Sequence, residues 1–211
     1  MNRYKEFTVP HPRVKLMTDI VRSYGPYRFF PTLTFNYALN DQEGIEAAST
    51  LVRRLNKKLL GKHWKKHGVQ PLRGIATLER TRLGRRKPDG SAVRDRASCH
   101  FHFLIQDHDS FARDESEAMC AFTQSFETVA RALNLNQRCK LVGRDGAVVR
   151  SVDTDGVMGY VVKDARFDSW LTKDRFFLLD ESGLLLMLPD ELLRRVRCPQ
   201  IKRRGINYSP L

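Results

Sequence analysis

Two histidines separated by one apolar residue stand inside residues 97–106 (Ala-Ser-Cys-His-Phe-His-Phe-Leu-Ile-Gln), a run typical of a buried β-strand. Side chains alternate between the two faces of a strand, so His100 and His102 are expected on one face and Phe101 and Phe103 on the other. Two imidazoles on one face make half of a metal site. The same spacing also suits two histidines packed in a core or an interface, so residues elsewhere must decide between the alternatives.

Glu79 supplies a third candidate ligand. It lies in residues 73–82, which resemble another strand, and the loop at 83–96 contains the turn sequence Pro-Asp-Gly at 88–90. An antiparallel hairpin of these two strands can place the carboxylate beside the imidazoles. Two imidazoles and one carboxylate suit Mg²⁺ or Mn²⁺ with positions left open for substrate, and zinc also accepts these ligand types. The alternative is an exposed glutamate that pairs with Arg80 or Arg82.

The other strands and helices are predicted from the spacing of their apolar residues and from helix-capping residues. Residues 28–37 are rich in aromatic and β-branched residues and are expected to form a strand. Apolar residues recur at helical spacing from 41 to 62, with Asn40 or Asp41 as cap, and again to 133 after a cap at Asp109 or Ser110. A fourth strand at 138–142, a turn at 143–146 and a helix at 154–165 follow. The predicted order, β-α-β-β-α-β and then a helix, is that of an α+β fold.

Composition and charge limit the function classes. The chain has 211 residues, 41% of them hydrophobic, which allows one well-buried domain, and its net charge of +13 indicates a polyanion as partner. No apolar run is long enough to span a bilayer, and the N-terminus lacks the apolar core of a signal peptide, so an intracellular protein is expected. The four cysteines form no Cys-x-x-Cys pair, and there is no ATP-binding phosphate loop.

Two basic segments are candidate contacts to nucleic acid. Their residue types suit phosphate contact, and Trp64 in the first segment suits stacking on a base. The alternatives are a solvated helix end for the first segment and a solvated loop for the second. The predicted DNA-binding residues are Lys62, Trp64 and Lys65 in the first segment, and Arg85, Arg86, Lys87, Arg94 and Arg96 in the second.

Three motifs in order carry a resemblance to a known family. Residues 30–35 (Phe-Pro-Thr-Leu-Thr-Phe) are similar to its hydrophobic first motif, His100-Phe101-His102 to its histidine motif, and Tyr160-Val-Val-Lys163 to its tyrosine motif. The chain thereby resembles the HUH endonucleases, in particular rolling-circle replication initiators (Rep) with a single catalytic tyrosine. The resemblance spans roughly residues 29 to 165. Each motif alone is weak, whereas the three in order, with Glu79 and a basic chain, are specific.

The resemblance implies a fold and a reaction. The fold is a central antiparallel sheet of about five strands flanked by helices, related to ferredoxin-like and RNA-recognition folds. A divalent metal, Mg²⁺ or Mn²⁺, would be held by His100, His102 and Glu79, and Tyr160 would attack a DNA phosphate to give a 5′-phosphotyrosyl link and a free 3′-hydroxyl. Lys163, one helical turn on, could ease loss of the tyrosine proton, contact the phosphate or help position the metal.

The implied partners are single-stranded or hairpin DNA at a replication origin of a plasmid or phage and a host helicase, in the cytoplasm of a bacterial host and without a membrane. We expect an N-terminal arm (1–27) with at most a short helix near 14–23, an endonuclease domain (28–175) and a C-terminal extension (176–211) with a basic tail. Competing interpretations are a transposase or mobilisation nuclease of the same superfamily and a catalytically silent DNA-binding domain. A structural zinc protein is a more distant alternative.

Overall fold

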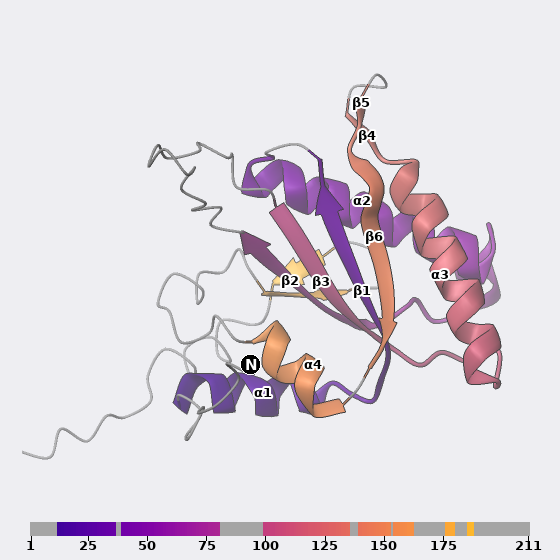
Figure 1. Ribbon diagram of the computed structural model, residues 1–211. Coiled ribbons are helices and arrows are strands. Elements are labelled where there is room, and N and C mark those ends of the chain that lie inside the picture. The colour runs from indigo at the N-terminus through magenta and orange to yellow at the C-terminus, as the bar shows by residue number, and fades with distance from the viewer. Residues whose placement is uncertain are drawn as a thin grey trace, which may run out of the picture.

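A six-stranded antiparallel sheet with the strand order β6-β1-β3-β2-β7-β8 forms the centre of the fold (Figure 1). The computed structural model describes residues 12–36, 39–80, 99–135, 139–152, 154–162, 176–179 and 185–187. The strands are β1 (Tyr27–Phe35), β2 (Gly74–Arg80), β3 (Cys99–Gln106), β6 (Val142–Ser151), β7 (Phe176–Leu179) and β8 (Leu185–Met187). The helices are α1 (Pro12–Ser23), α2 (Asp41–Leu60), the short 3₁₀ helix η1 (Trp64–His67), α3 (Glu115–Arg131) and α4 (Thr154–Val161).

The chain order confirms the predicted β-α-β-β-α-β arrangement and the α+β class. Because β1 and β2 are both antiparallel to β3, which lies between them, they run parallel to each other across α2, as in a split βαβ unit. Strands β7 and β8 extend the sheet beyond β2. The short helix expected near 14–23 is α1, and the domain boundaries at 27/28 and 175/176 stay predictions.

Helices cover both faces of the sheet, and the alternation of strand side chains produces two cores. On one face, Phe101 and Phe103 of β3 pack with α2 and α3, and Phe122 of α3 stacks on Phe29 of β1. On the other face, Leu104 of β3 packs with α1 and α4 (Figure 1). The apolar residues of this core continue along the same face toward His102, whose ring lies 5.1 Å from that of Tyr160 in α4.

Helix α2 begins where the sequence predicts. Asn40 is its cap: the Asn40 side chain accepts a hydrogen bond from the Glu43 backbone N–H, and the Glu43 carboxylate accepts one from the Asn40 backbone N–H. This reciprocal pair satisfies two of the four backbone donors that a helix start leaves without a partner. The C-terminal end, predicted at 62, comes at Leu60, before Gly61 with φ +89°.

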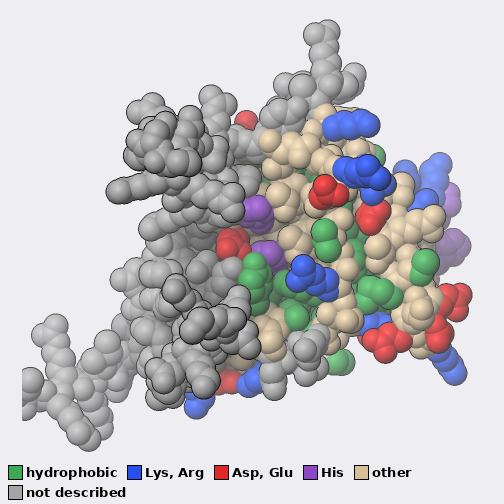
Figure 2. Space-filling view, in the orientation of Figure 1, with side chains coloured by type: hydrophobic (Ala, Val, Ile, Leu, Met, Phe, Trp, Pro, Cys, Tyr) green, Lys and Arg blue, Asp and Glu red, His purple; other side chains and the backbone are tan. Residues whose placement is uncertain are grey.

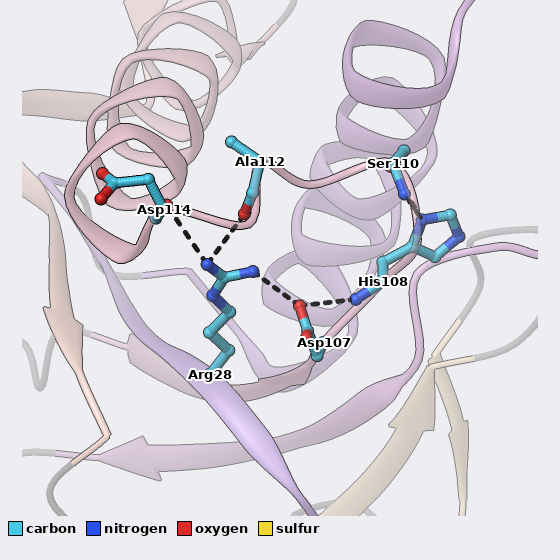
Figure 3. A network of polar contacts seen from close by, with 6 residues as sticks. All are labelled: Arg28, Asp107, His108, Ser110, Ala112 and Asp114. Atoms are coloured by element: carbon cyan, nitrogen blue, oxygen red, sulfur yellow. Dashed lines mark hydrogen bonds and ion pairs between the residues drawn. The ribbon is translucent and has the colours of Figure 1, made fainter.

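Helix α3 begins at Glu115, so the predicted cap at Asp109 or Ser110 is wrong. The Arg28 guanidinium donates to Asp107 Oδ1 at 2.8 Å and to the Ala112 carbonyl at 2.9 Å, and it also reaches the Asp114 carbonyl (Figure 3). These bonds hold the segment before the helix in a non-helical path. Asp114 is the cap instead, since its side chain accepts from the Glu117 backbone N–H.

The pH dependence of stability in the Asp107→Asn variant tests the contribution of the bond between Arg28 and Asp107. Slight burial opposes ionisation of Asp107, but the hydrogen bonds from Arg28 and from the His108 backbone N–H, together with the positive charge of Arg28, outweigh it and lower the pKa of Asp107 below its ordinary value of 3.8. The ionised carboxylate therefore stabilises the fold above the unfolded-state pKa, and this contribution is lost as pH falls through the folded-state pKa. Because the Asp107 side chain is exposed to solvent, we expect the variant to lose only about 0.5–1 kcal/mol at pH 7.

The measurement is urea denaturation of both proteins from pH 7 downward. The difference in free energy of unfolding between the two proteins should disappear at acidic pH. A difference that stays constant with pH would show that the Asp107 charge is not what stabilises the segment.

Strand β6 differs from the prediction of a strand at 138–142 and a turn at 143–146. Residues 142–151 form one continuous strand on the edge of the sheet, paired with β1. Cys139–Lys140 (β5) instead pairs with Asn134–Leu135 (β4), outside the sheet. Position 146 favours glycine because β6 approaches β1 closely there: a Cβ would lie 2.5 Å from the Thr34 carbonyl oxygen. This position lies next to the register shift between Leu33 and Phe35.

Candidate functional site

The three central strands place polar side chains together on the face that carries α4. In the register of the sheet, His100 pairs with Thr34 of β1 and Glu79 of β2, and His102 pairs with Thr32 and lies diagonally from Glu79. The predicted hairpin and the predicted placement of Glu79 beside the histidines are thereby confirmed. Histidine side chains are visible on this face next to acidic and apolar ones (Figure 2).

Short polar contacts fix both imidazoles. His102 Nε2 lies 2.9 Å from Glu79 Oε2, and His102 Nδ1 lies 3.1 Å from Thr32 Oγ1. His100 Nδ1 lies 3.0 Å from Thr34 Oγ1. Because the Glu79 carboxylate only accepts, His102 Nε2 carries the proton in this contact, and the Thr32 hydroxyl donates to Nδ1. A metal ion bound at Nε2 would replace that proton, and the hydroxyl would then accept from Nδ1–H. Sequence reasoning missed these threonines, although they alternate along their strand with the same period as the histidines.

The donor set fits a divalent metal in chemistry and in one measured distance. Neighbouring ligand atoms of an octahedral Mg²⁺ or Mn²⁺ lie about 3 Å apart when each is about 2.1 Å from the ion. The 2.9 Å between His102 Nε2 and Glu79 Oε2 therefore suits either a hydrogen bond or two adjacent ligands. Within the described parts of the chain, no group of three His, Cys, Asp or Glu side chains is already gathered for a metal, so the role of His100 as third ligand stays a prediction.

Tyr160 of α4 lies over the histidine face. Its ring centroid is 5.1 Å from that of His102, with the two planes at 86°, and Phe30 of β1 contacts both rings. His102 is only 6% exposed, whereas Tyr160 is 44% exposed, so the tyrosine is open to a large substrate while the imidazole beneath it is held. Helix α4 thus brings the third motif to the second across about 60 residues of chain.

A cavity of about 350 Å³ opens between α4 and the sheet. It is lined by Phe30, Thr32, His102, Val148, Arg150, Gly156, Val157 and Tyr160. Arg150 of β6 supplies a cation beside the tyrosine and the histidine, suited to a phosphate, and the sequence motifs did not indicate it. A larger cavity of about 520 Å³ lies at Arg28, but that guanidinium is already bonded to Asp107 and two carbonyls.

The remaining predicted site residues either lie outside the described residues or are not part of this group. Lys163 and the basic loop residues Arg85, Arg86, Lys87, Arg94 and Arg96 lie outside the described residues. Trp64 is 8% exposed with Lys65 Nζ 5.3 Å from its ring, and this burial argues against the predicted stacking of Trp64 on a base. Lys62 and Lys65 are exposed, and their predicted phosphate contacts are untested.

Comparisons of this chain with protein-family models, curated proteins and solved structures find no match. No helix in the portion that the structure describes is long and apolar enough to cross a membrane. Function is therefore inferred from the residues and their geometry.

Thr32→Val tests the role of the threonine hydroxyl while keeping the side-chain shape. Without it, Nδ1–H of the metal-binding form of His102 has no acceptor, so we expect Mn²⁺ binding to be weaker by about 10-fold. Calorimetric titration with Mn²⁺ measures the affinity. Thr32→Ser, which restores a hydroxyl, should recover it. Unchanged Mn²⁺ affinity in Thr32→Val would remove the threonine from the site.

Proposed function

We propose that the protein is a metal-dependent endonuclease that nicks and rejoins single-stranded DNA through a covalent link to Tyr160. The observation that carries this proposal is the contact of the Tyr160 and His102 rings, 5.1 Å apart, above the 2.9 Å pair of His102 and Glu79. Tyr160, His102 and Arg150 line one cavity, and the Glu79 carboxylate contacts His102. This combination favours attack on a phosphodiester.

Each of these side chains would have a separate role in the reaction. Tyr160 Oη forms a bond to phosphorus, and the bond from phosphorus to the 3′ oxygen of the preceding nucleotide breaks. The tyrosine gives up its proton to solvent, and the 3′ oxygen takes one up and leaves as a hydroxyl. Arg150, which lines the same cavity, would neutralise charge on the phosphate. Because the link conserves the phosphodiester bond energy, a free 3′-hydroxyl can reverse the step and rejoin the strand without ATP.

His102, Glu79 and His100 would hold a divalent ion. When bound, Mg²⁺ or Mn²⁺ supplies a Lewis acid for the non-bridging phosphate oxygens. Thr32 and Thr34 contact Nδ1 of the two imidazoles and orient the rings, and burial of His102 limits its rotation. The protein's own contribution is thus a fixed set of donors next to an exposed nucleophile.

The biological setting proposed is initiation of rolling-circle replication of a plasmid or phage, with the helicase supplied by the host in the bacterial cytoplasm. Nicking for transposition or mobilisation uses the same chemistry. In the family that the chain resembles, single-tyrosine transposases usually have glutamine where this chain has Lys163, and the lysine therefore favours an initiator. The net charge of +13 supports a nucleic-acid substrate in either setting.

A catalytically silent DNA-binding domain is the second candidate. The observation in its favour is that Glu79 is hydrogen-bonded to His102 and no three-ligand cluster is gathered among the described residues. The two candidates are distinguished by incubating the protein with single-stranded DNA and Mn²⁺ and separating the products in denaturing detergent. An adduct that survives detergent supports the nuclease, and a gel shift without such an adduct supports the silent domain.

A further inference from the structure

The long helix α2 and the segment after it carry a second charged surface, away from the histidine face. Residues 47–78 contain no Asp or Glu. Over the same stretch, exposed cations recur on the solvent side of α2 and on η1. We call these residues the basic ridge: Arg53, Arg54, Lys57, Lys58, Lys62, Lys65 and Lys66.

The ridge and the candidate site lie on opposite faces of the sheet. Helix α2 buries Leu51, Val52 and Leu55 in the core that it shares with α3, whereas Tyr160 belongs to the face of α1 and α4. A phosphate held by Lys57 or Lys58 is therefore not the phosphate at Tyr160. Whatever the ridge binds must be a different segment of a polyanion from the one in the site.

The lysines of the ridge are the cations available to such a partner. Arg53 donates to Thr50 Oγ1 and Arg54 to the Ala132 carbonyl, so the two arginines also serve the fold. Between Lys57, Lys58 or Lys62 and the carboxylates that the structure describes, there is no ion pair. Because cations recur with each helical turn of about 5.4 Å, several phosphates could be contacted at once.

The residues around the basic ridge indicate which class of polyanion it binds. An interfacial membrane helix needs an apolar face toward the lipid, and the apolar side of α2 is already buried in the protein. Binding of single strands by stacking needs exposed aromatic rings, and Trp64 is buried. Cations without stacking rings suit the regular phosphate backbone of a duplex. We propose that the basic ridge binds double-stranded DNA without sequence preference, independently of the chemistry at Tyr160.

The test compares two triple variants with the same net charge. Lys57→Gln/Lys58→Gln/Lys62→Gln removes three ridge cations, and Lys15→Gln/Arg113→Gln/Lys140→Gln removes three exposed cations elsewhere. Glutamine keeps helix propensity, so α2 should remain folded, which circular dichroism verifies. Binding to a fluorescent duplex of arbitrary sequence is measured by anisotropy in EDTA over a range of salt, so that no nicking contributes.

The ridge variant should bind the duplex about 10-fold or more weakly at 0.1 M salt, and its slope of log affinity against log salt should be shallower by about two to three. The control variant should change little. Equal losses in both variants would mean that net charge alone acts, and would overturn the proposal. Ridge-dependent binding that is tighter to single strands, or to vesicles of anionic lipid, would overturn it in favour of those partners. Repeating the duplex measurement with Tyr160→Phe separates this outcome from the nicking proposal, since that variant should bind duplex normally.

Discussion

Replacing Tyr160 by phenylalanine is expected to abolish covalent capture of single-stranded DNA while leaving DNA binding intact. The ring contact with His102 needs no hydroxyl, so phenylalanine should keep the packing at 5.1 Å and remove only the attacking oxygen. Because the proposal assigns the link to this oxygen, adduct formation and cleavage should fall by more than about 1,000-fold. Detergent gels of labelled oligonucleotide with Mn²⁺ measure the adduct, and anisotropy measures binding.

Tyr24→Phe is the matched control, because it removes another tyrosine hydroxyl from the described part of the chain. Tyr24 packs against the core of α1 and α4, and its carbonyl accepts from the side chain of Gln106, at the opposite end of β3 from His100. The control should capture DNA at the normal rate. Persistent capture by Tyr160→Phe would move the nucleophile to another tyrosine and contradict the assignment.

Replacing His102 by alanine is expected to remove metal dependence and cleavage together. The imidazole is the most buried of the proposed ligands and contacts Glu79, Thr32 and the ring of Tyr160, so its loss disturbs every part of the site. We expect a loss of at least about 100-fold in nicking rate at saturating Mn²⁺. The measurement is the initial rate of oligonucleotide cleavage across a Mn²⁺ titration.

The alanine variant also leaves a cavity, so a lower rate could reflect lost stability. Glu79→Gln meets this concern, because glutamine keeps the shape and one acceptor oxygen while removing the charge. It should weaken Mn²⁺ binding and slow nicking with little change in thermal stability. Normal nicking by either variant would refute the proposed metal site.

Much of the fold was predictable because side-chain periodicity and helix capping depend on residues that are close in sequence. Alternation in residues 97–106 predicted which side of β3 carries the histidines, and the Pro-Asp-Gly turn predicted the hairpin that brings Glu79 to them. Asn40 predicted the start of α2. These features depend on neighbours in sequence, so one chain was enough.

What sequence reasoning missed depends on contacts between distant residues. Arg28 lies 79 residues from Asp107, and its bonds delay the start of α3 past two good capping residues. The glycines at 143 and 146 resemble a turn in sequence, but Gly146 permits close approach to β1 and Gly143 permits close approach to the side chain of Asn36, just after β1. The bonds of Thr32 and Thr34 to the imidazoles, and the place of Arg150 beside Tyr160, also require the strand pairing to be known.

The most direct test of the central claim is to map the covalent link in the native protein. The protein is incubated with Mn²⁺ and a randomised pool of single-stranded oligonucleotides, adducts are isolated in detergent, and the attached peptide is identified by mass spectrometry after digestion. The account predicts a nucleotide joined through its 5′-phosphate to the hydroxyl of Tyr160, and sequencing of the DNA then gives the nick site. A link at another residue, or cleaved DNA with no covalent protein product, would contradict it.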